Sequence, residues 1–172
     1  MGNVTLLIGG VRSGKSSLAV EIGRRHDGDV VFVATAESFD DDMRSRIQHH
    51  RDERPDWPTI EAPLELAEAI ATAPTAPLMI VDCITVWVNN AMHHRREIAA
   101  EPVIAALVER SGPSVVITNE VGLGVHPETE MGRRYRDELG RVNQALAGAA
   151  SATLLLIAGK ALRLGDPWKE LT

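Results

Sequence analysis

The stretch VTLLIGGVRSGKSS, residues 4–17, joins an apolar run directly to a glycine-rich loop. Residues 4–8 are aliphatic or β-branched at every position, which is typical of a strand covered on both faces of a parallel sheet. From Gly9 to Ser16 the sequence fits the pattern Gly-x-x-x-x-Gly-Lys-Ser of a P-loop. The stretch therefore predicts a buried strand, a phosphate-binding loop and the start of a helix in direct succession.

This loop predicts binding of a nucleoside triphosphate. In such a loop the backbone N–H groups face the phosphate oxygens, a lysine neutralises the β- and γ-phosphates, and the serine hydroxyl ligates Mg²⁺. Here those two side chains are Lys15 and Ser16. The loop residues that we expect to bind nucleotide are Gly9, Gly10, Val11, Arg12, Ser13, Gly14, Lys15 and Ser16.

Outward from the loop, apolar runs alternate with helix-length segments along the whole chain. Strands are expected at 4–9, 30–34, 78–82, 114–118 and 152–158, and helices at 15–25, 40–53, 63–72, about 95–110 and 129–149. This alternation is typical of βαβ units. We predict an α/β fold, a P-loop NTPase-like three-layer domain with a mostly parallel central sheet. Residues 1–172 are expected to form a single P-loop nucleotide-binding catalytic domain.

Composition narrows the classes of partner. The 172 residues carry 18 Lys and Arg against 24 Asp and Glu, a net charge of −6, which argues against nucleic acid or anionic membranes as partners. Cys83 is the only cysteine, so an intrachain disulfide and two-cysteine metal motifs are excluded. The longest apolar stretch, residues 78–88, contains Asp82 and is too short to span a bilayer, and no signal peptide is evident. We expect a cytoplasmic protein without a membrane span.

Asp82 ends the apolar run LMIVD, and two roles suit a carboxylate there. In P-loop proteins an acid at the end of a strand supports the metal ion or its water. Aspartate is also a good N-cap for a following helix. Because strand ends in open α/β sheets face the ligand crevice, the sequence favours a metal or substrate role for Asp82.

Two adjacent histidines lie in the segment DDDMRSRIQHHRDERP, residues 40–55. Met43, Ile47 and His50 are spaced as one face of a helix, whereas His49 falls among polar positions. His50 is therefore expected to face the body of the protein. It could be a hydrogen-bonded histidine at the edge of the core, or a neutral imidazole that attacks phosphorus in a bound nucleotide.

Several segments together resemble one known family, the bifunctional adenosylcobinamide kinase / adenosylcobinamide-phosphate guanylyltransferase of cobalamin biosynthesis. The resemblance covers roughly residues 4 to 164, and the histidine segment and the block after residue 118 are more specific than the P-loop. Besides the histidine segment, the matching stretches are LLIGGVRSGKSSLA, FVATAE, VDCITVWVNN and TNEVGLGVHPETEMGRRYRDELGRVNQALA.

The resemblance implies two reactions. ATP or GTP first phosphorylates adenosylcobinamide, and GTP then gives GMP to an active-site histidine with release of pyrophosphate. The phosphorylated acceptor takes the GMP to form adenosylcobinamide-GDP. In the family motif, here Arg46-Ile47-Gln48-His49-His50, the nucleophile falls on His50, the residue that the helical face also selects. The resemblance further implies Mg²⁺ as cofactor and a homo-oligomer such as a trimer.

The same resemblance extends the predicted site beyond the P-loop. Lys15 and His50 are the implied catalytic residues, and Ser16 and Asp82 the implied metal ligands. For Glu61 the alternative is an ordinary carboxylate at a strand edge. The further nucleotide-binding residues implied by the family are Ala34, Thr35, Ala36, Arg51, Asp52, Glu53, Arg54, Glu61 and Asp82.

Two other functions compete with this one. The chain could be a simple P-loop small-molecule kinase in which His50 is structural, or a nucleotide-dependent binding or switch module with little turnover. Near the fourth strand, Asn119 and Glu120 could hold a ligand or only their own loop.

Overall fold

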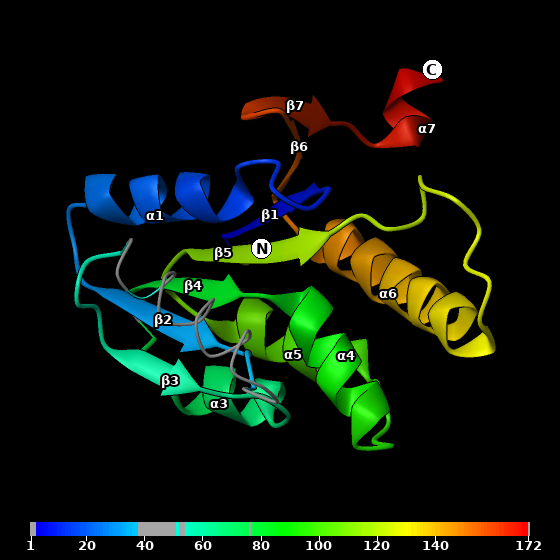
Figure 1. Cartoon of the computed structure of the whole chain (residues 1–172). Coiled ribbons are helices and arrows are strands. Elements are labelled where there is room, and N and C mark those ends of the chain that lie inside the picture. The colour runs from blue at the N-terminus through cyan, green and yellow to red at the C-terminus, as the bar shows by residue number, and fades with distance from the viewer. Residues whose placement is uncertain (1–2, 38–50, 52–53, 76, 172) are drawn as a thin grey trace.

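The computed structural model describes residues 3–37, 51, 54–75 and 77–171, arranged as a central sheet between two layers of helices (Figure 1). Across the described residues the sheet has seven strands in the order β3-β2-β4-β5-β1-β6-β7. All neighbouring pairs are parallel except β6 with β7. The strands are β1 Val4–Gly9, β2 Val30–Ala34, β3 Thr59–Glu61, β4 Leu78–Asp82, β5 Ser114–Asn119, β6 Ala152–Ile157 and β7 Lys160–Leu164.

Helices cover the sheet on both faces. Helix α1 packs on one face through Ala19, which joins Leu7, Ile80 and Ile117 in one buried cluster. The larger cluster lies on the opposite face, where α3 to α6 pack (Figure 1). The helices are α1 Lys15–Arg25, α3 Leu66–Thr72, α4 Ile84–His93, α5 Ala100–Glu109, α6 Glu130–Ala149 and the short α7 Pro167–Glu170.

The predicted fold class is confirmed, because the sheet is mostly parallel and is enclosed by helices. The five expected strands and the helix at 15–25 are found within a residue of their predicted ends. The helices expected at 63–72 and 95–110 are shorter, at 66–72 and 100–109. The helix expected at 40–53 falls outside the described residues, apart from Arg51.

Four elements were not predicted: β3, β7, α4 and α7. Strand β3 has only three residues, and every residue of β7 is exposed, so neither shows an apolar run. Helix α4 begins two residues after β4 and buries six of its ten residues, so the apolar pattern continues across the boundary. None of the helices found among the described residues is long and apolar enough to cross a membrane.

The parallel strands end together and thereby assemble the predicted site. Ala34 at the end of β2 pairs with Asp82 at the end of β4, and Gly9 at the end of β1 pairs with Asn119 at the end of β5. We call this side of the sheet the carboxyl edge. It is the side on which open α/β sheets bind ligands.

Candidate nucleotide-binding site at the carboxyl edge

The P-loop has its lysine drawn into the loop. Lys15 is 6% exposed, and its Nζ donates to the carbonyl oxygens of Gly9 at 3.0 Å and Gly10 at 2.6 Å, and to Ser13 Oγ at 3.3 Å. Burial lowers the pKa of Lys15, while Cys83 and the Asp82 carboxylate act in the opposite direction. The ammonium group therefore donates to carbonyl oxygens near Asp82, in the part of the loop that would bind phosphates.

The turn between β6 and β7 packs against this loop. Gly159 donates its N–H to the carbonyl oxygen of Ser13 at 2.9 Å. Gly14 has φ +97°, and a Cβ there would lie 3.2 Å from the Cα of Gly159. A Cβ on Gly9 would lie 2.3 Å from the carbonyl oxygen of Leu156. At both glycines of the P-loop pattern, Gly9 and Gly14, the backbone lies so close to the last hairpin that a side chain would not fit without a shift.

The residues after β2 are fixed to the end of β4. Thr35 is fully buried, and its Oγ1 donates to the carbonyl oxygen of Cys83 and accepts from the Cys83 N–H, both at 2.8 Å. The Thr35 N–H donates to the carbonyl oxygen of Asp82 at 3.1 Å. The threonine hydroxyl is thus engaged with the neighbouring strand end, and this places residues 34–36 beside Asp82.

Asp82 lies between the P-loop and the arginines after the histidine segment. Its carboxylate raises the pKa of both Lys15 and Arg54, although burial lowers the pKa of each overall. Helix α4 has Cys83 at its N-cap, one residue beyond Asp82, so the alternative of Asp82 as the helix cap is not what the structure shows. Asp82 is therefore within electrostatic reach of both Lys15 and Arg54, and all three residues were predicted from the sequence.

The arginines predicted to bind nucleotide border a cavity of about 260 Å³. Arg54 stacks on Phe32, with its guanidinium carbon 3.7 Å from the ring centre, and donates to Thr59 Oγ1 at 3.0 Å. Its Nη1 is buried and has no hydrogen-bond partner among the described residues. Arg51 instead forms an exposed ion pair with Glu61, with Nη2 and Oε1 2.5 Å apart. The cavity is lined by Arg51, Arg54, Pro55, Asp56, Trp57 and Thr59.

At the end of β5 a buried polar network fixes Asn119. Its N–H donates to Thr85 Oγ1 at 2.6 Å, and its carbonyl oxygen accepts from Asn143 Nδ2 at 2.9 Å. The hydroxyl of Thr118 donates to Asn143 Oδ1 at 2.7 Å. The sequence signal for this network was the polar residues on the buried faces of α4 and α6, Thr85 and Asn143.

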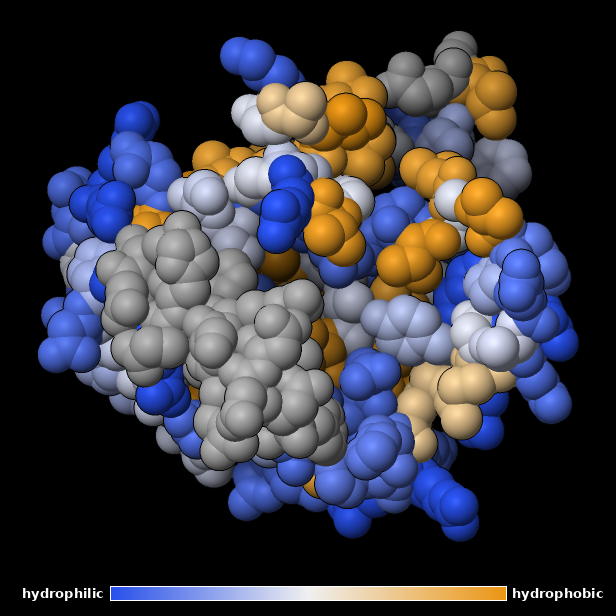
Figure 2. Space-filling view, viewed as in Figure 1, coloured by the Kyte–Doolittle hydropathy of each residue, from blue (hydrophilic) through white to orange (hydrophobic). Residues whose placement is uncertain are grey.

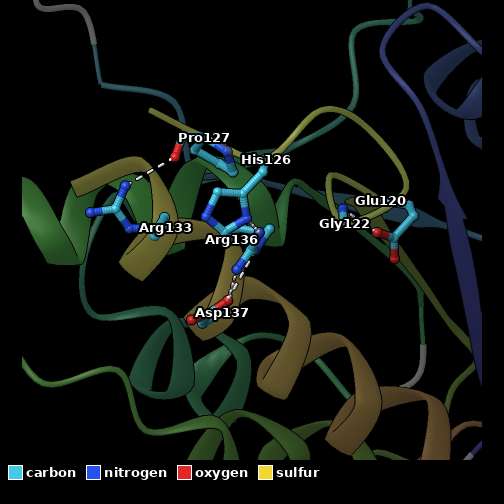
Figure 3. A network of polar contacts seen from close by, with 7 residues as sticks. All are labelled: Glu120, Gly122, His126, Pro127, Arg133, Arg136 and Asp137. Atoms are coloured by element: carbon cyan, nitrogen blue, oxygen red, sulfur yellow. Dashed lines mark hydrogen bonds and ion pairs between the residues drawn. The ribbon is translucent and has the colours of Figure 1, made fainter. Parts of the chain in front are cut away.

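The loop after β5 is held by its own polar contacts (Figure 3). The Glu120 carboxylate accepts from the N–H of Gly122, which supports the interpretation that Glu120 holds the loop. Further along, Arg136 bonds to His126 Nδ1 at 2.9 Å and pairs with Asp137, and Arg133 donates to the carbonyl oxygen of Pro127 at 3.1 Å (Figure 3). These contacts place the arginines of α6 on the loop and not at the P-loop.

His50, Asp52 and Glu53 lie outside the described residues. On the near side of that segment, Glu37 pairs with Nε2 of His94, the C-cap residue of α4, at 2.9 Å. Within the described ranges, no group of three or more His, Cys, Asp or Glu side chains is arranged to hold a metal ion.

Comparison with known proteins identifies the family. Residues 5–164 match the family described as cobinamide kinase / cobinamide phosphate guanyltransferase. The chain belongs to this family. It is 37% identical over 169 residues to the bifunctional adenosylcobalamin biosynthesis protein CobP of Pseudomonas aeruginosa, with 94% of this chain and 98% of that protein covered. It is 35% identical over 178 residues to the bifunctional adenosylcobalamin biosynthesis protein CobU of Escherichia coli K12, with 92% and 98% covered.

Solved structures support the fold alone. An ATPase from the type III secretion system of pathogenic bacteria superposes with a TM-score of 0.56 at 11% identity, over 99% of this chain and 54% of that one. A Pyrococcus horikoshii protein, PH0250, gives a TM-score of 0.56 at 8% identity, over 96% of this chain and 89% of that one. At such low identity these likenesses carry only the arrangement of sheet and helices.

Proposed function

We propose that this protein phosphorylates adenosylcobinamide with ATP or GTP and then transfers GMP from GTP to the product, forming adenosylcobinamide-GDP and pyrophosphate. The observation that carries the proposal is the carboxyl edge, where Asp82 acts electrostatically on both the P-loop residue Lys15 and Arg54, in a chain that belongs to the cobinamide kinase family. The family relationship selects the acceptor, because a P-loop alone indicates only the nucleotide.

The guanylyl step is proposed to run through His50. The imidazole nitrogen attacks the α-phosphorus of GTP, an N–P bond forms, and the bond to the leaving pyrophosphate breaks. A phosphate oxygen of the acceptor then attacks the same phosphorus and releases the histidine. Lys15 neutralises the β- and γ-phosphates in both reactions, and the N–H groups of residues 9–16 hold their oxygens.

We propose Mg²⁺ as the cofactor, with the Ser16 hydroxyl and the Asp82 carboxylate as its protein ligands. Both are hard oxygen donors, and Asp82 acts electrostatically on the P-loop lysine, so the two side chains fit a cation beside bound phosphates. When bound, the ion neutralises charge on the phosphate oxygens. The chain's own part is to present these oxygens next to Lys15 and to fix Asp82 through the bonds of Thr35.

The remaining proposals concern the whole chain. Residues 1–172 are proposed to form one catalytic domain that acts in the cytoplasm. We propose that this domain binds no nucleic acid and has no membrane span. A homo-oligomer such as a trimer is supported by large apolar side chains that are exposed on the β5–α6 loop, at the start of α6, on the last hairpin and at α7, several of them gathered on the face drawn in Figure 2. These side chains are Leu123, Val125, Met131, Ile157, Leu162, Leu164, Trp168 and Leu171.

Labelling with GTP tests the guanylyl step. The protein is incubated with Mg²⁺ and GTP labelled at the α- or the γ-phosphate, denatured, and mapped by peptide. We expect acid-labile, base-stable label from the α-phosphate alone on the peptide holding His50, lost in His50→Ala and kept in the matched control His49→Ala. Label on His49 would move the nucleophile by one residue.

The competing functions give different results in the same assay. Absence of covalent label in protein that binds GTP would remove the guanylyltransferase mechanism. Acceptor-dependent formation of ADP or GDP would then indicate the simple kinase, and tight nucleotide binding without acceptor-dependent turnover would indicate the switch module.

A further inference from the structure

Asn90 is a fully buried side chain that joins two separate segments of the carboxyl edge. It lies on α4 and is 0% exposed. Its Nδ2 donates to the carbonyl oxygen of Thr35 at 2.8 Å and to that of Pro63 at 3.0 Å. One amide group therefore uses both of its hydrogens on the backbone just beyond β2 and β3.

These two segments carry residues of the predicted site. Thr35 belongs to residues 34–36, and Pro63 lies two residues after Glu61. Ala62 donates its N–H to the carbonyl oxygen of Ala34 at 2.8 Å, so the two segments are already neighbours. Because Thr35 is also bonded to Cys83 and Asp82, Asn90 completes a chain of hydrogen bonds across the ends of three strands.

The bonds of Asn90 have an energetic cost that packing alone does not explain. Its Oδ1 is buried without a hydrogen-bond partner among the described residues. A buried acceptor without a partner lowers stability, because it has lost its hydrogen bonds to water. The neighbouring buried side chains of α4, Trp87, Val88 and Ala91, are mostly apolar, so an apolar residue would suit the same face. Local rules are broken in this way chiefly where a site needs fixed geometry.

The same loop offers a built-in comparison. Trp87, one turn earlier on α4 and also buried, donates Nε1 to the carbonyl oxygen of Leu64 at 2.8 Å. Its side-chain hydrogen bond therefore holds the loop after β3 and does not involve residues 34–36. Asn89, next in the chain to Asn90, is exposed. Loss of stability through the loop can thus be separated from loss of the bond to Thr35.

We propose that Asn90 is a positioning residue of the nucleotide site, which holds residues 34–36 and the end of β4 in register for nucleotidyl transfer. This inference rests on the proposed function. The side-chain hydrogen bonds of Asn90 go to Thr35 and Pro63 and not to the P-loop. We therefore expect GTP still to be bound through its phosphates when Asn90 is replaced, whereas the alignment of the bound nucleotide is lost.

The test is the rate of protein labelling from α-labelled GTP, measured against GTP concentration. Asn90→Ala is expected to lower the maximal rate by about ten- to a hundredfold, as misalignment of about an ångström does, with the half-saturating GTP concentration changed less than about threefold. Trp87→Phe and Asn89→Ala, with unfolding midpoints recorded alongside, are expected to label at nearly the wild-type rate.

A second variant keeps the test independent of folding. Asn90→Asp has the same shape, but its carboxyl group donates a hydrogen bond only when protonated, and burial among carbonyl oxygens raises its pKa. Its labelling rate relative to wild type is therefore expected to increase as the pH falls from 8 to 5.5. Such a pH dependence would show directly that the side chain at position 90 acts as a hydrogen-bond donor.

The outcomes separate the two proposals. Wild-type protein that binds GTP without labelling would overturn the proposed guanylyl step, whatever Asn90 does. Labelled wild type with Asn90→Ala at an equal maximal rate, or with Trp87→Phe slowed as much, would overturn the positioning role alone. A pH-independent ratio for Asn90→Asp would do the same.

Discussion

Asn90 and Arg110 are two buried side chains with the same kind of bonding at opposite ends of the sheet. Arg110 follows α5, is 5% exposed, and donates Nη1 to the carbonyl oxygen of Pro74 and Nη2 to that of Pro77, both at 2.8 Å. Asn90 likewise donates two bonds to backbone carbonyls. Arg110, however, ties down the turn that enters β4, whereas Asn90 ties down the segments that leave β2 and β3.

On the role proposed for Asn90, position, more than bonding pattern, separates a stabilising side chain from a functional one. Both side chains satisfy carbonyl groups that a loop would otherwise bury unpaired. At the end where strands enter, the result is a fixed turn. At the carboxyl edge the same bonds fix the backbone that faces the P-loop, so their loss is expected to appear in the chemistry.

The largest expected effect follows replacement of the P-loop lysine. Lys15→Met removes the cation that would meet the β- and γ-phosphates, and we expect both transfer reactions to fall on the order of a hundredfold or more. The substitution also leaves the carbonyl oxygens of Gly9 and Gly10 without this donor, so we expect the unfolding midpoint to fall as well, and the rates are compared well below it. Steady-state rates and thermal unfolding check this, with the exposed Lys169→Met as control. Equal loss in both variants would contradict it.

Arg110→Met sharpens the comparison from the other end. It leaves the carbonyl groups of Pro74 and Pro77 without their donor, and we expect the free energy of unfolding to fall by about 2–4 kcal/mol. Well below the unfolding midpoint, GTP labelling should proceed at the wild-type rate. Denaturant titration and labelling measure the two effects. The control is Arg96→Met, whose exposed ion pair with Glu65 should contribute less than about 1 kcal/mol. A labelling defect in Arg110→Met would break the comparison.

The smallest expected effect concerns the thiol at the carboxyl edge. Burial, reinforced by the Asp82 carboxylate, raises the pKa of Cys83 to about 12. The unfolded thiol titrates near its ordinary value of about 8.5, so unfolding releases a proton above that pH. The stabilisation is therefore complete below about pH 8.5 and is lost as the pH rises toward 12.

Denaturant titration between pH 8 and 10 measures this loss. The free energy of unfolding should decline more steeply in wild type than in Cys83→Ser, because all other titrating groups are common to both proteins. The range stops at pH 10 because burial also raises the pKa of Tyr135, to about 12, and its own contribution changes above that pH. Parallel curves for the two proteins would contradict the burial of the thiol.

The sequence predicted those parts of the fold in which one pattern had one interpretation. The buried strands are apolar runs, and the P-loop before α1 has glycine and lysine at fixed positions. All of these elements were found where expected. Helix α4 was missed because its apolar residues follow β4 without a break. Asn90 was missed with it. A buried asparagine becomes a candidate site residue only when the structure shows that its helix lies beside the ends of β2 and β3.

Sheet order has a consequence for the order in which the chain can assemble. β1, the first strand synthesised, pairs with β5 and β6, which lie more than a hundred residues later. While the chain is still on the ribosome, β2 can therefore pair with β3 and with β4. At that stage β1 cannot pair, because β5 and β6 have not yet been synthesised. The P-loop gains its contact with the β6–β7 turn only after residue 159 has been synthesised, so nucleotide binding should emerge after that point in translation.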